Sequence, residues 1–254
     1  MWRDEWRYFL TALMFFTRVP VQLRDYRETD LNRSTRYFPL IGVLVGAFAA
    51  AVFWLAGTLV PYDIAILLSM IATILLTGAF HEDGLADAAD GLGGGVDKEQ
   101  ALTIMQDSRI GSYGAIVLVM ALLLKFHLLA LIRPDVLMLA LIAGHSLSRY
   151  MAVLVIATQS YVRFSGKSKP LATRLQSGDV LLASLFGLLP AIWMGLHFGE
   201  GLLAYVLLPV LVMWAWFSYK LHRRLGGYTG DCLGATQQLT ELAFYLGVLA
   251  WSVA

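Results

Sequence analysis

Long apolar stretches, separated by shorter polar ones, run through most of the chain. Seven of them are close to the length, about 20 residues, that a helix needs to cross a bilayer. They cover residues 40–60, 64–80, 114–132, 136–157, 180–198, 202–219 and 236–253. The pattern therefore predicts an all-α fold, a polytopic membrane bundle of about seven transmembrane helices formed by the single domain 1–254.

Residues 1–39 precede the first of these stretches and follow a different pattern. Apolar side chains recur there at helical spacing, beside Arg3 and Arg7. They are Trp2, Trp6, Phe9, Leu10 and Leu13. A basic, amphipathic helix of this kind is typical of a segment that lies in the membrane interface. We expect a cytoplasmic or interfacial segment, and leave open whether residues 8–23 span or re-enter.

The composition agrees with a membrane-embedded chain. Hydrophobic residues make up 58% of the 254 residues and charged residues only 15%, whereas average soluble domains carry about 25% charged residues. The mean hydropathy is +0.67. We therefore expect the lipid bilayer around the chain and no nucleic acid among its partners, with a homo-oligomer left open.

The Lys and Arg residues are distributed unevenly between the two sides of this predicted bundle. Sixteen of the 19 fall in the segments 1–39, 81–113, 158–179 and 220–235, which the alternation of spans places on one side. On the opposite side lies only Arg133. Because positive residues favour the cytoplasmic side, the N-terminus and these polar segments should face the cytoplasm and the C-terminus should face outward.

The segment 81–113 opens with a dense acidic motif, Phe80-His81-Glu82-Asp83-Gly84-Leu85-Ala86-Asp87-Ala88-Ala89-Asp90-Gly91. On a helix, Asp83, Asp87 and Asp90 fall within an arc of about 60°. Glu82 and His81 point away from that arc. Three like charges on one face need a cation, and hard oxygen ligands favour Mg²⁺ or Mn²⁺. The segment is a candidate catalytic loop, and the alternative is a solvated acidic helix start.

Three further polar stretches share the predicted cytoplasmic face, 107–114, 163–169 and 226–235. In the first, Asp107 and Arg109 precede a glycine-bearing helix start, and in the last, glycines surround Asp231. Carboxylates that hold Mg²⁺, together with basic side chains and free backbone amides, are suited to phosphoryl transfer. The basic stretch 163–169 is more typical of a contact with lipid headgroups.

Some ionisable residues lie within the predicted spans, where each needs a partner. Arg149 is about two turns inside the cytoplasmic end, and either the acidic motif or a substrate phosphate could supply its anion. Glu241 is one turn into the last span and is a candidate partner for Arg149 or for Lys125.

The acidic motif resembles the signature of the bacterial cobalamin synthases, or adenosylcobinamide-GDP ribazoletransferases, in the pattern Phe80-His81-x-Asp83-Gly84-Leu85-Ala86-Asp87-x-x-Asp90-Gly91. The resemblance extends to Asp107-Ser108-Arg109-x-Gly111 and to Gly226-Gly227-x-Thr229-Gly230-Asp231-x-Leu233-Gly234-Ala235. It also includes Phe16-Thr17-Arg18-Val19-Pro20 and Tyr37-Phe38-Pro39-Leu40-Ile41-Gly42, so it covers almost the whole chain. Glu82 is not part of the pattern.

This resemblance implies an Mg²⁺-dependent, multi-pass enzyme of the bacterial inner membrane, with its active site on the cytoplasmic side. Such an enzyme joins α-ribazole, or its 5′-phosphate, to adenosylcobinamide-GDP and releases GMP. Asp83, Asp87 and Asp90 are then expected to bind the metal and, with Arg109, to be catalytic. Together with the buried Arg149, the residues expected to bind substrate are His81, Asp107, Ser108, Thr229 and Asp231.

Two other functions fit parts of the pattern. Asp87-x-x-Asp90-Gly91 matches the first part of the motif of CDP-alcohol-type membrane phosphotransferases. Leu92-Gly93-Gly94 follows it here, where that family has Ala-Arg. A cation transporter would also place carboxylates among membrane helices. Its ligands would lie near the membrane midplane, whereas these carboxylates lie at the end of a predicted span.

Overall fold

The structure is a computed structural model that describes every residue except 1, 22, 24–26, 28–29 and 163–174. In the described part the chain is a succession of helices, and extended pairing is limited to one isolated bridge between Tyr161 and Tyr228. The elements are α1 (Trp2–Phe16), α2 (Asp30–Ser34), η1 (Thr35–Tyr37), α3 (Phe38–Ala56), α4 (Tyr62–Thr77), α5 (Phe80–Gly94), α6 (Lys98–Met105), α7 (Ser112–Leu131), α8 (Pro134–Thr158), α9 (Ser177–Phe198), α10 (Gly201–Leu225) and α11 (Gly230–Ser252). The predicted all-α fold is confirmed, whereas the basic stretch 163–169 lies outside the described residues.

Five helices of the described chain are long and apolar enough to cross a membrane. They are α3 with the short helices before it, α7, α8, α9 and α10, and the bent pair of α4 and α5 meets the same criterion jointly. All seven predicted spans lie in helices, but the number seven is not confirmed. The last of them, α11, does not meet the criterion, and Gln237, Gln238 and Glu241 lie within it.

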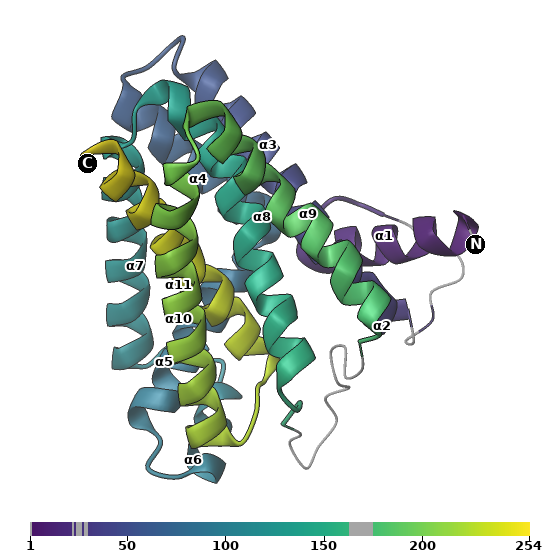
Figure 1. Cartoon of the computed structure of the whole chain (residues 1–254). Helices are drawn as coiled ribbons and strands as arrows, with labels where there is room; N and C mark the ends of the chain where they lie inside the picture. The colour runs from purple at the N-terminus through teal and green to yellow at the C-terminus, as the bar shows by residue number, and fades with distance from the viewer. Residues whose placement is uncertain (1, 22, 24–26, 28–29, 163–174) are drawn as a thin grey trace.

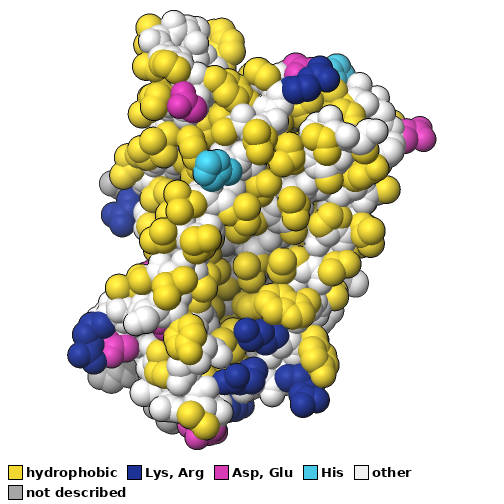
Figure 2. Space-filling model, turned by 90° about the vertical axis from the view of Figure 1, so that its left-hand side faces the viewer, with side chains coloured by type: hydrophobic (Ala, Val, Ile, Leu, Met, Phe, Trp, Pro, Cys, Tyr) yellow, Lys and Arg dark blue, Asp and Glu magenta, His cyan; other side chains and the backbone are white. Residues whose placement is uncertain are grey.

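The outer surface agrees with a bilayer environment. Large apolar side chains of α7 and α10, such as Val119, Leu123, Leu208 and Val212, are exposed. On the face in Figure 2, hydrophobic side chains cover the middle, and most of the Lys and Arg side chains gather toward the lower end. An apolar band of this kind with basic residues at one end is typical of a protein that spans a membrane.

A sharp bend between α4 and α5 determines where the acidic motif lies. Gly78 and Ala79 both have a left-handed backbone, with φ values of 66° and 59°. Glycine adopts this conformation freely, whereas alanine adopts it at a cost. The N–H of Arg18 donates to the carbonyl of Leu76 at 2.7 Å, beside the turn. The two helix axes differ in direction by 85°, so that α5 crosses the end of the bundle where α7 and α11 begin.

Helix α8 forms the centre of the bundle. Most of its residues are buried, and α3, α9 and α11 pack around it (Figure 1). Gly46 of α3 lies against the backbone of α8, since a Cβ atom there would be 2.6 Å from the carbonyl oxygen of Leu141. Gly42 makes a similar contact with the carbonyl of His145. Small residues at these contacts let membrane helices approach closely, and they hold α8 firmly in the interior.

The N-terminal helix α1 is joined to the bundle by ion pairs. Arg7 binds Asp30 of α2 at 2.7 Å, and Arg36 of η1 binds Glu5 at 2.8 Å. In Figure 1, α1 extends away from the bundle and crosswise to α7 and α10. Trp2 and Trp6 are 86% and 61% exposed. The predicted helix is confirmed, and its place in the membrane interface stays a prediction.

The uneven distribution of Lys and Arg predicts the orientation of the chain in the membrane. A reporter fused after Ala254 should read periplasmic. One inserted near Gly94, which is exposed at the end of α5, should read cytoplasmic. Reporter enzymes active on only one side of the membrane measure both positions. The reverse result at either position would contradict seven crossings, with residues 8–23 as the first candidate for an additional crossing or re-entry.

Candidate active site

Helices α5 and α11 touch through glycines at the point where the acidic motif lies. A Cβ atom on Gly84 would be 2.9 Å from the carbonyl oxygen of Asp231 and 3.3 Å from the Cα of Gly234. One on Gly234 would be 3.2 Å from the carbonyl oxygen of His81. These distances are shorter than ordinary van der Waals contacts. Glycine at both positions therefore brings the carboxylate of Asp231 beside those of α5.

Three carboxylates, those of Asp83, Asp87 and Asp231, lie within electrostatic reach of one another at this contact. Asp83 is exposed and Asp87 is half-buried, and the charges of Asp83, Asp231 and Asp90 all act on Asp87. Burial raises the pKa of Asp231, the negative charge of Asp83 adds to that effect, and a hydrogen bond from Thr229 opposes it. Like charges held together in this way favour a bound cation.

Asp90 also has a structural role, which the sequence did not indicate. Its carboxylate is only 7% exposed and accepts hydrogen bonds from the backbone N–H groups of Gly111 at 2.7 Å and of Gly114 at 2.8 Å. A Cβ atom on either glycine would collide with that carboxylate. Asp90 therefore caps the N-terminus of α7, where a negative charge is favourable. It fixes α5 against α7 and lies within electrostatic reach of Asp87.

In the described part of the chain, no group of three or more His, Cys, Asp or Glu side chains is arranged so that it could hold a metal ion. The predicted ligand set of Asp83, Asp87 and Asp90 therefore stays a prediction. The structure adds Asp231, which the sequence placed only among the substrate-binding residues.

The loop between α6 and α7 carries an exposed ion pair. Nη2 of Arg109 lies 2.7 Å from Oδ2 of Asp107, and the Arg109 side chain is 87% exposed. Hydrogen bonds from Arg109 lower the pKa of Asp107 to about 2. Ser108 between them is exposed. Two residues after Arg109 comes Gly111, which binds Asp90, so this loop is tied to the acidic helix.

Thr229 begins α11 and orients Asp231. Its hydroxyl oxygen accepts the N–H of Cys232 at 3.3 Å, and its hydroxyl donates to Oδ2 of Asp231 at 3.3 Å. The preceding residue, Tyr228, exchanges backbone hydrogen bonds of 2.9 and 3.0 Å with the chain just after α8. The glycine-rich stretch 226–235 thus holds Asp231 from two directions.

His81 and Arg149 lie on the other side of α5, in the interior. They are 3% and 2% exposed. Nη1 of Arg149 donates to the carbonyl of His145 at 2.9 Å, and the charges of Glu241 and Glu82 act on its guanidinium. Glu82 is buried and accepts a hydrogen bond from Gln238 at 2.9 Å. The structure does not bring Arg149 into contact with the carboxylate cluster, and Glu82 is the part of the acidic motif that faces it.

Deeper in the bundle, Lys125 and Glu241 form a buried ion pair. Nζ of Lys125 lies 2.6 Å from Oε1 of Glu241, and their side chains are 6% and 1% exposed. The hydroxyl of Tyr245 donates to the same oxygen at 3.1 Å, and Gln237 donates to the other. The sequence offered Lys125 and Arg149 as partners of Glu241, and the direct partner is Lys125.

Comparison with known proteins identifies the family. The profile of the family described as "Cobalamin-5-phosphate synthase" matches residues 8–249. The chain belongs to this family. A protein of Ralstonia pickettii named adenosylcobinamide-GDP ribazoletransferase is 49% identical, over 98% of this chain and 97% of its own length. One of Shewanella woodyi with the same name is 48% identical, over 99% and 98%. No solved structure matches the chain.

Membership of the cobalamin-5-phosphate synthase family confirms the resemblance drawn from the sequence motifs. It does not by itself assign roles to the polar residues of the interior. Sequence reasoning missed Gln237 and Gln238, which lie beside Glu241 on α11 and point at α5 and α8. The available signal was four polar residues, Gln237, Gln238, Thr240 and Glu241, within five positions of a predicted span.

Proposed function

We propose that this chain is an Mg²⁺-dependent transferase that joins α-ribazole, or its 5′-phosphate, to adenosylcobinamide-GDP and releases GMP. The convergence of Asp83, Asp87 and Asp231 at the α5–α11 contact is the observation that carries this proposal. The names of the relatives supply the substrates. The distribution of Lys and Arg supports an active site at the cytoplasmic face of a bacterial inner membrane.

The donor atoms available at the contact fit Mg²⁺. Carboxylate oxygens suit an ion that keeps several water ligands and takes one or two carboxylates, and one of the three, Asp83, is exposed. Asp83, Asp87 and Asp231 would hold it, while Asp90 remains bound to Gly111 and Gly114 and keeps α5 in place. When bound, the ion neutralises charge on phosphate oxygens and on the departing phosphate.

The chain's own residues then position two reacting groups. A ribose hydroxyl that is free in both α-ribazole and its 5′-phosphate, and so is not the 5′-hydroxyl, forms a bond to the phosphorus attached to cobinamide, and the P–O bond to GMP breaks. A carboxylate near the hydroxyl accepts its proton. Arg109, exposed two residues before Gly111, can turn from Asp107 to a phosphate and offer it a planar pair of N–H donors.

An assay of GMP release tests this function. Purified protein should release GMP from adenosylcobinamide-GDP when Mg²⁺ and α-ribazole are both present, and chelation of divalent ions should abolish release. Undiminished release with either component left out would contradict the proposal. A CDP-alcohol phosphotransferase would instead consume CDP-linked substrates.

Replacement of Arg109 by Lys tests the phosphate contact. Lys keeps the charge and loses the planar fork, so kcat/KM should fall by roughly tenfold to a hundredfold, with membrane assembly unchanged. Arg133→Lys is a matched control, because Arg133 forms a similar exposed pair with Asp135 at 2.6 Å on the opposite side of the bundle. Wild-type turnover by Arg109→Lys would remove Arg109 from the site.

A further inference from the structure

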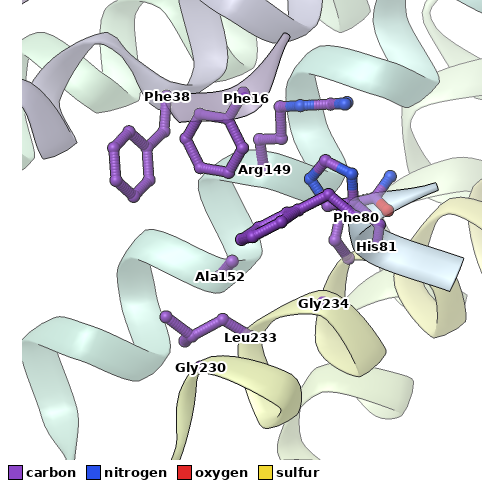
Figure 3. A pocket seen from close by; sticks show the side chains of 10 residues that line it. Phe16, Phe38, Phe80, His81, Arg149, Ala152, Gly230, Leu233 and Gly234 are labelled. Carbon is purple, nitrogen blue, oxygen red and sulfur yellow. The ribbon is translucent and has the colours of Figure 1, made fainter. Parts of the chain in front are cut away.

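A small cavity lies beside the carboxylate cluster, on the inner side of α5. Its walls include Phe16, Phe38 and Phe80, together with His81 and Arg149 (Figure 3). Its volume is about 20 Å³, which is room for a water molecule. An adjoining cavity shares His81, Arg149 and Gln237 and reaches Glu82.

Several polar atoms on these walls have no hydrogen-bond partner among the described residues. They are Nε of Arg149, Nε2 of His81 and Oε1 of Gln237, each on a side chain at most 3% exposed. A buried polar atom left unpaired costs about 1–3 kcal/mol, so native proteins rarely keep several together. These atoms belong to residues that line the cavity, and a molecule that entered it could form hydrogen bonds with them.

Aromatic rings make up much of the remaining lining, beside Ala152 and Leu233, and we call this cavity the slot. The ring of Phe16 stacks on that of His81, with centroids 5.5 Å apart and planes 10° from parallel. Phe38 meets Phe16 edge-on at 4.4 Å. Offset or edge-on contact with such rings favours a planar aromatic ligand over an aliphatic one of the same size.

Phe80 closes the slot on its outer side. It touches Phe16 and His81 edge-on, at 5.8 and 5.4 Å, and is 37% exposed. Because part of its ring already faces outward, a change of rotamer can carry it away from Phe16 and His81. The space vacated would enlarge the cavity from the volume of a water toward that of a ring.

The cavity also reaches the reacting groups. Gly230 and Gly234 of α11 contribute to its wall, and Asp231 follows Gly230 directly. A nucleoside whose base occupied the slot could therefore extend its sugar past Gly230 toward Asp231 and the carboxylates of α5.

We propose that this slot, opened by rotation of Phe80, binds the planar heteroaromatic base of the nucleoside acceptor. Nε–H of Arg149 donates to the free ring nitrogen of the base, and the rings of Phe16 and His81 contact its face. The inference rests on the proposed function, because it places the acceptor of that reaction. It gives Arg149 and His81 a role in recognising the base rather than a phosphate.

Two probes of the same size, benzimidazole and indole, should bind to this slot with different affinities. Benzimidazole has a ring nitrogen with a free lone pair, and indole has carbon at that place. Indole would leave Nε–H of Arg149 buried and unpaired, so it should bind the purified full-length protein about tenfold more weakly. Isothermal titration in detergent measures both affinities on the unmodified protein, without any risk of misfolding.

Two variants locate the binding. Phe16→Leu removes an aromatic face and should weaken the binding of benzimidazole by about tenfold. Phe48→Leu on α3, which is 40% exposed and does not line the slot, should leave the affinity unchanged. Equal affinities for benzimidazole and indole, an unchanged affinity in Phe16→Leu, or no saturable binding would each overturn the proposal. None of these results depends on GMP release, so failure of the proposed function would be seen separately.

Discussion

Replacing Asp83 or Asp87 with Asn should reduce turnover by roughly a hundredfold or more and abolish the rise in Tm caused by Mg²⁺. Each substitution removes a charge and almost no volume. Neither residue is fully buried, so the fold should persist. An ion that binds only the native state raises its stability by mass action. Loss of that effect therefore reports loss of the metal rather than loss of structure.

The two neighbouring carboxylates should behave differently from this pair. Asp90→Asn should also lose turnover, but it should lower the Tm without Mg²⁺ as well, because an amide cannot accept both N–H groups of Gly111 and Gly114. Glu82→Gln should be far milder in turnover and should keep the response to Mg²⁺, since Glu82 faces Gln238 in the interior. Thermal unfolding with and without Mg²⁺ measures all four variants. Loss of turnover in Glu82→Gln, together with normal turnover in Asp87→Asn, would contradict this assignment of the metal ligands.

Breaking the pair of Lys125 and Glu241 should produce the largest loss of stability. Lys125→Met leaves the carboxylate of Glu241 buried without its cation, and removing one partner of a buried ion pair costs about 3–5 kcal/mol of unfolding free energy. The double variant Lys125→Met with Glu241→Gln removes both charges and should recover most of that loss. Lys98→Met, at an exposed position on α6, is the matched control and should have little effect. A single variant as stable as the control would mean that the pair contributes nothing.

The sequence predicted the helices well, because apolar length and helical spacing are local properties. Asp83 and Asp87 were correctly placed on one face of a helix, and Glu82 on another, from the 3.6-residue repeat alone. The left-handed conformation of Ala79 was not predictable, since alanine rarely adopts it. The bend that it makes with Gly78 depends on the packing of α5 against α7 and α11.

The site was predicted only in part, because its completion depends on contacts between distant segments. Asp90 was grouped with the metal ligands by helical spacing, yet its hydrogen-bond partners are 21 and 24 residues away. The partner of Glu82 is 156 residues away. Asp231 joins the cluster because glycines on two helices meet, and no local pattern shows which glycines will do so.

The central claim is that one divalent ion is held where α5 and α11 touch. Crystals grown with Mn²⁺ test it directly, because anomalous scattering locates that ion. We expect a peak bound by Asp83, Asp87 and Asp231, with Asp90 still bound to the N–H groups of Gly111 and Gly114, and no peak in Asp87→Asn. A peak held by other residues, or one that persists in Asp87→Asn, would contradict this account of the site.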